Sequence, residues 1–234
     1  PAEARYVLAE VAKWGNLIGG GANLTFSFAS PNTFDVTQGY DQDFISAKGG
    51  LQGGLEIIEF SDAEKVIARD ALDAWAAFGD ITFEEVVESP ENFGNYGELR
   101  FFGLDFEAFR AAGYTEDFSA DTMAFAYLPG TFEAAGDFVI NTNEPSDTSY
   151  FKYVALHEIG HALGLDHPFE GIQIAPTEID NATNTVMSYT PGDPSLNYPT
   201  TPVDWDIEAI QYLYGVADHN AGDTTYTFGP DDTY

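Results

Sequence analysis

The sequence has no cysteine and few basic residues, and both absences narrow what the protein can do. Without cysteine, the 234-residue chain forms no disulfide and offers no thiolate to a metal, so nitrogen and oxygen atoms must bind any metal. Only 8 lysine and arginine residues stand against 39 acidic ones, which gives a net charge of −31. Such a charge repels nucleic acid and anionic membranes, so neither is expected as a partner.

Long apolar runs are also missing. No segment approaches the roughly 18–20 apolar residues that a membrane-spanning helix requires, so no transmembrane segment is expected. What is present suffices for a packed core, because 44% of the residues are hydrophobic and 15% are aromatic. The acidic excess is typical of a solvated acidic surface, and adaptation to saline or calcium-rich surroundings is a second interpretation.

Alternation and periodicity predict an α+β arrangement. A capping-box pattern at Ser61 and Glu64 begins a helix that extends to about residue 78. Three more helices are expected, an amphipathic one at 3–13, one at 149–163 and a closing one at 206–214. Residues 166–200 are rich in turn-forming types and predict a mostly irregular region. Five strands are expected, at 24–28, 81–87, 99–102, 123–128 and 138–141.

Three of the four histidines fall within residues 157–167, which read HEIGHALGLDH. On a helix, His157 and His161 lie one turn apart on the same face, so both imidazoles can reach one ion at about 2.0–2.1 Å. If the helix continued, His167 would lie about 9 Å further along its axis. Gly164 stands where the helix must end and the chain turn back, because glycine tolerates the positive φ that such an ending needs.

The spacing predicts a catalytic Zn²⁺ site. Three histidine ligands leave the fourth position of a tetrahedral zinc ion open for water, and Glu158 between the first two histidines is placed to act as general base. Any one of these histidines alone would be better interpreted as a surface or packing residue, but their combined spacing is specific. The fourth histidine, His219, is expected on the surface.

Followed along the chain by Val186-Met187-Ser188-Tyr189, the motif resembles the metzincin zinc endopeptidases. The residue directly after the third histidine is Pro168. With this proline the motif resembles that of the serralysin family of secreted bacterial proteases. Segments 24–28, 124–130 and 206–215 agree with that family, so the resemblance covers nearly the whole chain. It implies a metzincin-like fold with a roughly five-stranded twisted mixed sheet backed by two helices. An irregular C-terminal subdomain completes this fold, with zinc in the cleft between the two parts.

The resemblance also implies roles for two residues after the motif. Met187 is expected to form an apolar floor beneath the three imidazoles. Tyr189 is expected to be a weak fourth protein ligand of zinc and a catalytic residue, whose phenol donates a hydrogen bond to the developing oxyanion. Thr190 and then Pro191 follow where serralysins usually have an aromatic residue, so the resemblance does not define the primed-side specificity pocket of this chain.

The resemblance divides the chain into a catalytic domain at 1–220, whose sheet-containing part ends near 164, and the start of a calcium-binding repeat domain at 221–234. Asp223 would then contribute to a calcium site completed by residues beyond Tyr234, although an exposed loop aspartate is the simpler interpretation. Ca²⁺ is therefore expected only together with such repeats. The family further implies a secreted, extracellular bacterial protein, a monomer, with protein or peptide substrates and a proteinaceous inhibitor as partners.

The function predicted from these features is hydrolysis of peptide bonds by zinc-activated water. Extended substrates would pair with the edge of the strand at 123–128, which favours broad specificity because main-chain pairing demands no particular sequence. The alternative is a catalytically silent metal- or calcium-binding extracellular module on the same scaffold. Another metzincin, such as an astacin-like protease, is a third interpretation that Pro168 disfavours.

Overall fold

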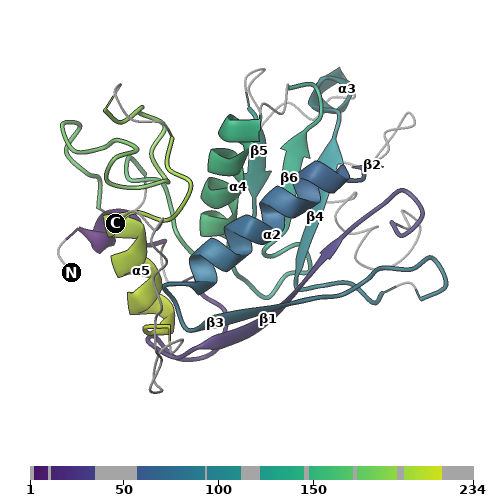
Figure 1. Ribbon diagram of the computed structural model, residues 1–234, viewed down its shortest axis with the longest axis horizontal. Helices are drawn as coiled ribbons and strands as arrows, with labels where there is room; N and C mark the ends of the chain where they lie inside the picture. Colours follow the sequence, from purple (N-terminus) through teal and green to yellow (C-terminus); the bar gives the residue numbers. More distant parts are fainter. Residues whose placement is uncertain are drawn as a thin grey trace, which may run out of the picture.

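The computed structural model describes residues 3–9, 12–34, 57–92, 94–111, 122–144, 148–170, 173–193 and 198–217. Two predicted features, His219 and the calcium-related segment 221–234 with Asp223, lie outside the described residues. Among the described residues, helices cover both faces of one mixed sheet, and the C-terminal part lies at one end (Figure 1). This arrangement confirms the predicted α+β, metzincin-like fold.

The sheet runs in the order β3 (Ile81–Glu85), β1 (Ala22–Phe28), β4 (Leu99–Leu104), β6 (Phe138–Asn141) and β5 (Ala124–Ala126), and β2 (Ile57–Ile58) pairs with β4 off this path. Neighbours among the first four strands of that order run parallel, whereas β5 is antiparallel to β6 and β2 is antiparallel to β4. All five predicted strands are present, and β5 stands at the end of the order as the substrate hypothesis requires. The sixth strand, β2, was not predicted because two residues carry no readable alternation.

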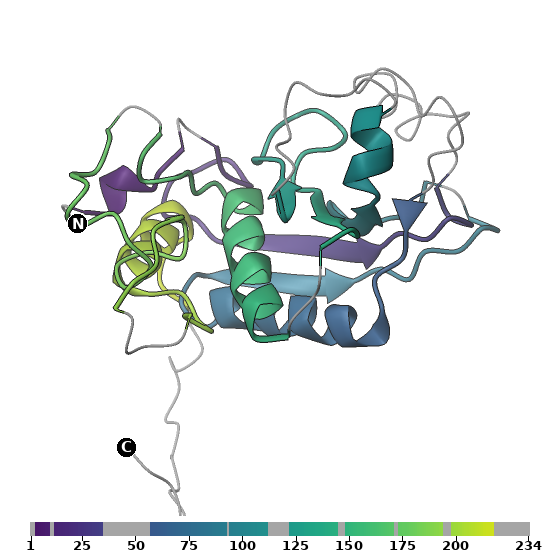
Figure 2. The ribbon, with the colours of Figure 1, turned by 90° about the horizontal axis from the view of Figure 1, so that it is seen from above.

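Two long helices, α2 (Asp62–Ala76) and α4 (Thr148–Ala162), pack on each other and on one face of the sheet (Figure 2). Alternation along β4 explains this: Phe101 joins the core cluster that contains both helices, while its neighbour Phe102 joins the cluster on the opposite face. The second cluster includes Phe106 from the short helix α3 (Phe106–Ala111), which was not predicted.

The predicted start of α2 is confirmed. The side-chain oxygen of Ser61 accepts a hydrogen bond from the main-chain N–H of Glu64 at 3.3 Å, and the carboxylate of Glu64 accepts one from the main-chain N–H of Ser61 at 2.7 Å. This reciprocal pair satisfies two of the donors that a helix start leaves open.

The amphipathic helix predicted at 3–13 is wrong. Among residues 3–9 and 12–13, which the structure describes, only a 3₁₀ turn forms, η1 (Ala4–Tyr6). Leu8 instead makes an antiparallel bridge with Leu165, and the N–H of Ala9 donates to the carbonyl of Gly164 at 3.2 Å. The main chain of this segment therefore forms hydrogen bonds with the chain reversal that follows α4. In a helix at 3–13, these main-chain groups would be bonded within the helix and could not pair with the reversal.

The predicted irregular region and closing helix are both found. Between α4 and α5 (Asp204–Tyr214), the described residues contain neither helix nor strand. Helix α5 packs against η1 beside this irregular part (Figure 1). None of the helices within the described ranges is long and apolar enough to cross a membrane.

Candidate zinc and catalytic site

The motif helix α4 carries the first two histidines, and Gly160 between them has a packing reason. A Cβ atom on Gly160 would lie 2.6 Å from Sδ of Met187 and 3.1 Å from Cζ2 of Trp75. The thioether of Met187 therefore packs directly on the helix at this point, and its side chain is fully buried. This contact places the segment around Met187 against the motif helix, in agreement with the floor implied by the resemblance.

The chain reverses after α4 as the sequence predicts. Gly164 has a φ of 105°, and a Cβ atom there would lie 2.0 Å from the carbonyl oxygen of Ala12. Two carbonyls at the end of the helix accept hydrogen bonds from remote segments. The indole N–H of Trp14 donates to the carbonyl of Ala162 at 2.8 Å, and the hydroxyl of Tyr214 donates to that of Leu163 at 2.8 Å. Residues from both ends of the chain thus hold the reversal.

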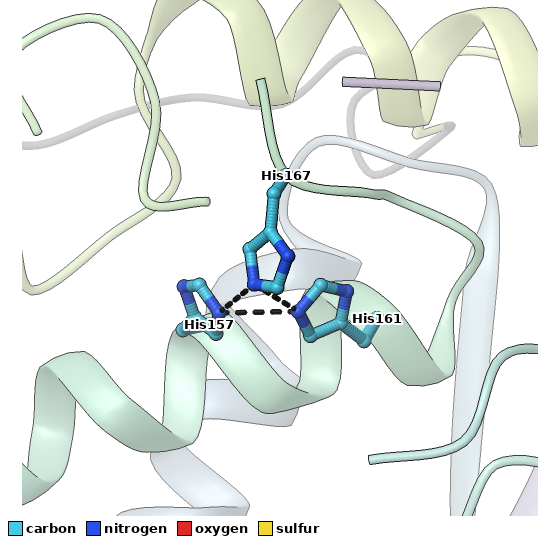
Figure 3. A group of neighbouring side chains, drawn as sticks. All are labelled: His157, His161 and His167. Atoms are coloured by element: carbon cyan, nitrogen blue, oxygen red, sulfur yellow. Dashed lines mark hydrogen bonds between the residues drawn. The ribbon is translucent and has the colours of Figure 1, made fainter. Parts of the chain in front are cut away.

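The reversal brings His167 over the two histidines of α4 (Figure 3). The three Nε2 atoms lie 3.1 Å apart for His157 and His161, 3.1 Å for His157 and His167, and 3.0 Å for His161 and His167. All three predicted histidines therefore meet at one point.

The other ring nitrogens decide which tautomer each histidine takes. Nδ1 of His157 lies 2.7 Å from the carbonyl of Val186, and Nδ1 of His161 lies 2.8 Å from that of Leu165. A carbonyl oxygen only accepts hydrogen bonds, so both Nδ1 atoms carry the hydrogen and both Nε2 atoms present lone pairs. Nδ1 of His167 similarly faces a carboxylate oxygen. Three lone pairs that face one another need a cation between them.

A zinc ion fits this donor set. Nitrogens 3.0–3.1 Å apart can all lie at the about 2.0–2.1 Å that zinc–imidazole bonds require. Burial lowers the pKa of His157 to about 3, and burial also lowers the pKa of His161 well below its usual value. Both imidazoles are therefore neutral, which is the form that binds a metal.

Glu158 lies buried beside the histidines. The main-chain N–H of Ala126 in β5 donates to its carboxylate, whereas Oε2 has no hydrogen-bond partner among the described residues. Desolvation raises the pKa of Glu158 to about 8. An unpaired buried carboxylate oxygen is costly and is typical of a group that acts on a bound molecule.

Tyr189 lies at the same site. Its ring stacks on His157 with centroids 5.5 Å apart and meets the ring of His167 at 4.6 Å. Desolvation, aided by the negative charges of Glu158 and Glu170, raises the pKa of its phenol to about 12, so the hydroxyl keeps its proton at neutral pH. The ring of Tyr189 therefore contacts two of the three histidines, and its role as a zinc ligand and catalytic residue stays a prediction.

A buried aspartate of α5 organises the segment that carries Met187 and Tyr189. Asp206 accepts hydrogen bonds from the hydroxyl of Thr185 at 2.5 Å and from the main-chain N–H groups of Val186 and Val203, both at 2.9 Å. Desolvation raises the pKa of Asp206 to about 6, although its three donors lower it. Since the carbonyl of Val186 accepts from His157, Asp206 connects α5 to a histidine of the motif.

A cavity of about 330 Å³ opens beside Glu158, and sequence reasoning missed part of its lining. Four tyrosines line it. Two of them, Tyr150 and Tyr153, contact the ring of Tyr198, at 5.2 Å and 4.9 Å between ring centroids. The hydroxyl of Tyr153 also donates to the carbonyl of Ser188 at 2.6 Å. The first two tyrosines precede His157 at helical spacing, a signal that could have revealed them. The lining residues are Thr122, Met123, Ala124, Tyr150, Tyr153, Val154, His157, Glu158, Tyr189, Thr190, Pro191 and Tyr198.

Comparison with known proteins identifies the family. Residues 56–215, which contain α2, the motif helix and α5, match a peptidase family described as Matrixin. The chain belongs to this matrixin family of peptidases. Metzincin peptidases of this kind use zinc, and the histidine group is able to hold it.

Three relatives refine the position within the metzincins. Serralysin A of Dickeya chrysanthemi is 34% identical, over 91% of this chain and 43% of the relative. Serralysin of Photorhabdus laumondii is 31% identical over 74% of this chain and 38% of the relative, and Metallopeptidase AprA of Pseudomonas marginalis is 31% identical over 77% and 39%. The predicted serralysin-like metzincin domain is therefore confirmed. The chain spans less than half the length of each of these relatives.

Proposed function

We propose that the protein is a zinc-dependent endopeptidase that hydrolyses peptide bonds of extended protein substrates. The observation that carries this proposal is the convergence of three imidazole lone pairs next to a buried carboxylate with an unpaired oxygen. His157, His161 and His167 would hold the metal. Zinc held there would act as a Lewis acid that polarises a carbonyl group and lowers the pKa of water to about 7.

Glu158 would serve as the general base, because the positive charge of a zinc ion held by the histidines would lower its pKa below the value of about 8 that burial alone gives. Its Oε2 is free to take a proton from the attacking water, while the N–H of Ala126 holds the carboxylate in place. The proton would then pass to the leaving amine nitrogen, so that Glu158 ends the cycle unprotonated. Burial shields this transfer from bulk water.

Tyr189 would stabilise the developing oxyanion. Its phenol keeps its proton and its ring contacts two of the three histidines, which places a hydrogen-bond donor at the edge of the site. It would also be the weak additional zinc ligand that the family resemblance implies. Such a donor acts most strongly on the charge of the transition state, as catalysis requires.

Substrate binding would use the edge of the sheet and the cavity. Strand β5 is last in the strand order and carries Ala126, whose N–H contacts Glu158, so a peptide paired with β5 passes the base directly. The tyrosine-lined cavity beside Glu158 would accept one substrate side chain, and its aromatic walls favour a large one. Main-chain pairing elsewhere would keep specificity broad.

Other properties belong to the proposal through the serralysin resemblance alone. They are secretion to the extracellular space of a bacterium, a monomeric state, and a proteinaceous inhibitor as a partner. Ca²⁺ would bind together with a C-terminal repeat domain beginning near residue 221. Size-exclusion chromatography with light scattering would test the monomer, and a dimer mass would contradict it.

The decisive experiment compares the unaltered protein with Glu158→Gln. Cleavage of an unstructured protein is expected to fall by at least about 100-fold in the variant, because proton transfer is lost, while one zinc per chain is retained. Tyr189→Phe should lower kcat and leave zinc stoichiometry unchanged. Zinc is measured by elemental analysis and cut sites by mass spectrometry. Full cleavage by Glu158→Gln would remove it as the base, and zinc binding without cleavage by the unaltered protein would favour a silent metal-binding module.

A further inference from the structure

The third histidine differs from the other two in the partner of its second ring nitrogen. Nδ1 of His157 and Nδ1 of His161 donate to main-chain carbonyls, whereas Nδ1 of His167 lies 3.0 Å from Oε2 of Glu170. A main-chain acceptor is present whatever the side chain, but a carboxylate depends on one residue. The side chain of Glu170 is 58% exposed and that of His167 only 13%.

A tight turn brings the carboxylate back over the imidazole. The main-chain N–H of Glu170 donates to the carbonyl of His167 at 3.1 Å, which closes the turn 167–170. On one side of it, Oδ1 of Asp166 accepts from the main-chain N–H of His167 at 2.8 Å. Within the turn, the carbonyl of Pro168 accepts from the N–H of Ala175 at 2.8 Å. These hydrogen bonds hold the turn independently of the Glu170 side chain.

An aromatic ring fixes the plane of the same imidazole. Phe169 lies parallel to His167, with an interplanar angle of 9° and centroids 4.8 Å apart, and also contacts Tyr189 at 5.0 Å. Stacking limits tilting of the imidazole but leaves a half-turn rotation about the Cβ–Cγ bond open, which would turn Nε2 away from the other two histidines. The hydrogen bond to Glu170 stops that rotation, so Nε2 stays directed at the two histidines of α4 (Figure 3).

We propose that Glu170 is a positioning residue that sets how tightly the site holds zinc. A carboxylate on Nδ1 of a metal-binding histidine fixes the tautomer, orients the ring and makes Nε2 a stronger donor. The inference rests on the zinc centre of the proposed function but not on peptide hydrolysis. Among the three histidines, His167 is then the one whose strength as a zinc ligand depends on a side chain, which a substitution can change.

A rival arrangement would use the same carboxylate differently. Asp166, His167 and Glu170 each offer a ligand atom within 4.8 Å of the others, which could hold a separate cation. Such an ion would have to displace the hydrogen from Nδ1 of His167. Oδ1 of Asp166 already accepts from a main-chain N–H, and Oε2 of Glu170 faces Nδ1 at hydrogen-bond distance. The contacts therefore favour the hydrogen bond.

The test measures zinc dissociation constants of the full chain by competition with a chromophoric chelator. Glu170→Ala is expected to weaken zinc binding about 10–100-fold, and Glu170→Gln less, because its amide oxygen still accepts a hydrogen bond but carries no charge. Glu178→Ala is the matched control, since it removes the same charge from an exposed position of the same irregular region. It should stay within about twofold of the unaltered protein, as a remote charge is screened by salt.

A second readout separates positioning from mere stabilisation of the turn. In the Co²⁺-substituted protein, Glu170→Gln should shift the visible absorption bands, because the ligand field of the third imidazole changes. The melting temperature of the metal-free protein should stay the same, since the main chain holds the turn. A melting temperature that falls in proportion to zinc affinity would reduce Glu170 to a turn stabiliser and overturn the proposal.

The remaining outcomes are equally distinct. Equal dissociation constants for Glu170→Ala and Glu178→Ala would overturn the role of Glu170. Two metal ions per chain, one of them lost in Glu170→Ala, would establish the separate cation site instead. Failure of the unaltered protein to bind zinc would remove both proposals. Zinc binding without peptide cleavage would remove only the proposed function, and the Glu170 comparison would stand.

Discussion

The zinc site joins two regions that are built in different ways. His157 and His161 stand on one helix and are 5% and 9% exposed as whole residues, and main-chain carbonyls hold both imidazoles. His167 stands on an irregular turn and is held by Phe169 and Glu170. The helical pair is set by local spacing, whereas the third ligand depends on a chain reversal.

The difference teaches where such a site is vulnerable. A helix fixes the distance between two ligands by its own geometry. The reversal needs donors and acceptors from elsewhere, and here the N–H of Asp166 donates to the carbonyl of Val7 at 2.9 Å while Trp14 and Tyr214 satisfy the last carbonyls of α4. We therefore expect the helical half to tolerate remote changes better than the turn half.

The largest expected effect comes from removing one ligand of each kind. Both His161→Ala and His167→Ala should weaken zinc binding by more than about 100-fold. This is a larger effect than removal of a residue that only contacts a ligand, such as Glu170. His167→Ala should retain more affinity, because the remaining pair on α4 is already in place, whereas His161→Ala leaves ligands from two separate segments. Chelator competition on both variants measures this. Tighter binding by His161→Ala would break the comparison.

The helical half has a pH-sensitive support in Asp206. Its pKa is raised to about 6 in the fold, above the ordinary 3.8, so the native state holds the proton more tightly than the unfolded chain. The contribution of this group to stability is therefore fully present below about pH 4 and is lost as pH rises through about 6. Asp206→Asn cannot titrate, so the unaltered protein should lose up to about 3 kcal/mol relative to the variant over that range.

Urea unfolding of both metal-free proteins at several pH values between 4 and 7 checks the sign. Comparing the two proteins cancels the titration of the many other carboxylates, which they share. If the unaltered protein instead gained stability over Asp206→Asn with rising pH, the three hydrogen bonds to Asp206 would outweigh its desolvation. The attachment of Val186, and through it of His157, would then depend on the charged form.

The same contrast explains what the sequence could predict. The helical pair and Gly164 follow from spacing and from the positive φ of a reversal, so they were predicted correctly. The helix at 3–13 was predicted wrongly, because its apolar periodicity was real but Leu8 and Ala9 pair with residues more than a hundred positions away. The partners of the third ligand were missed for a similar reason. Nothing in the pattern at 168–170 shows that the carboxylate folds back.

The smallest expected effect tests the remote support of the reversal. Trp14→Phe keeps most of the ring but removes the N–H that donates to the carbonyl of Ala162, which should lower the free energy of unfolding by about 0.5–1.5 kcal/mol. Zinc affinity should fall by less than in Glu170→Ala, because the ligands themselves stay in place. Trp205→Phe, on a ring that packs against Tyr6, controls for the lost indole volume. If both substitutions changed zinc affinity equally, the N-terminal segment would stabilise the domain as a whole and not the reversal in particular.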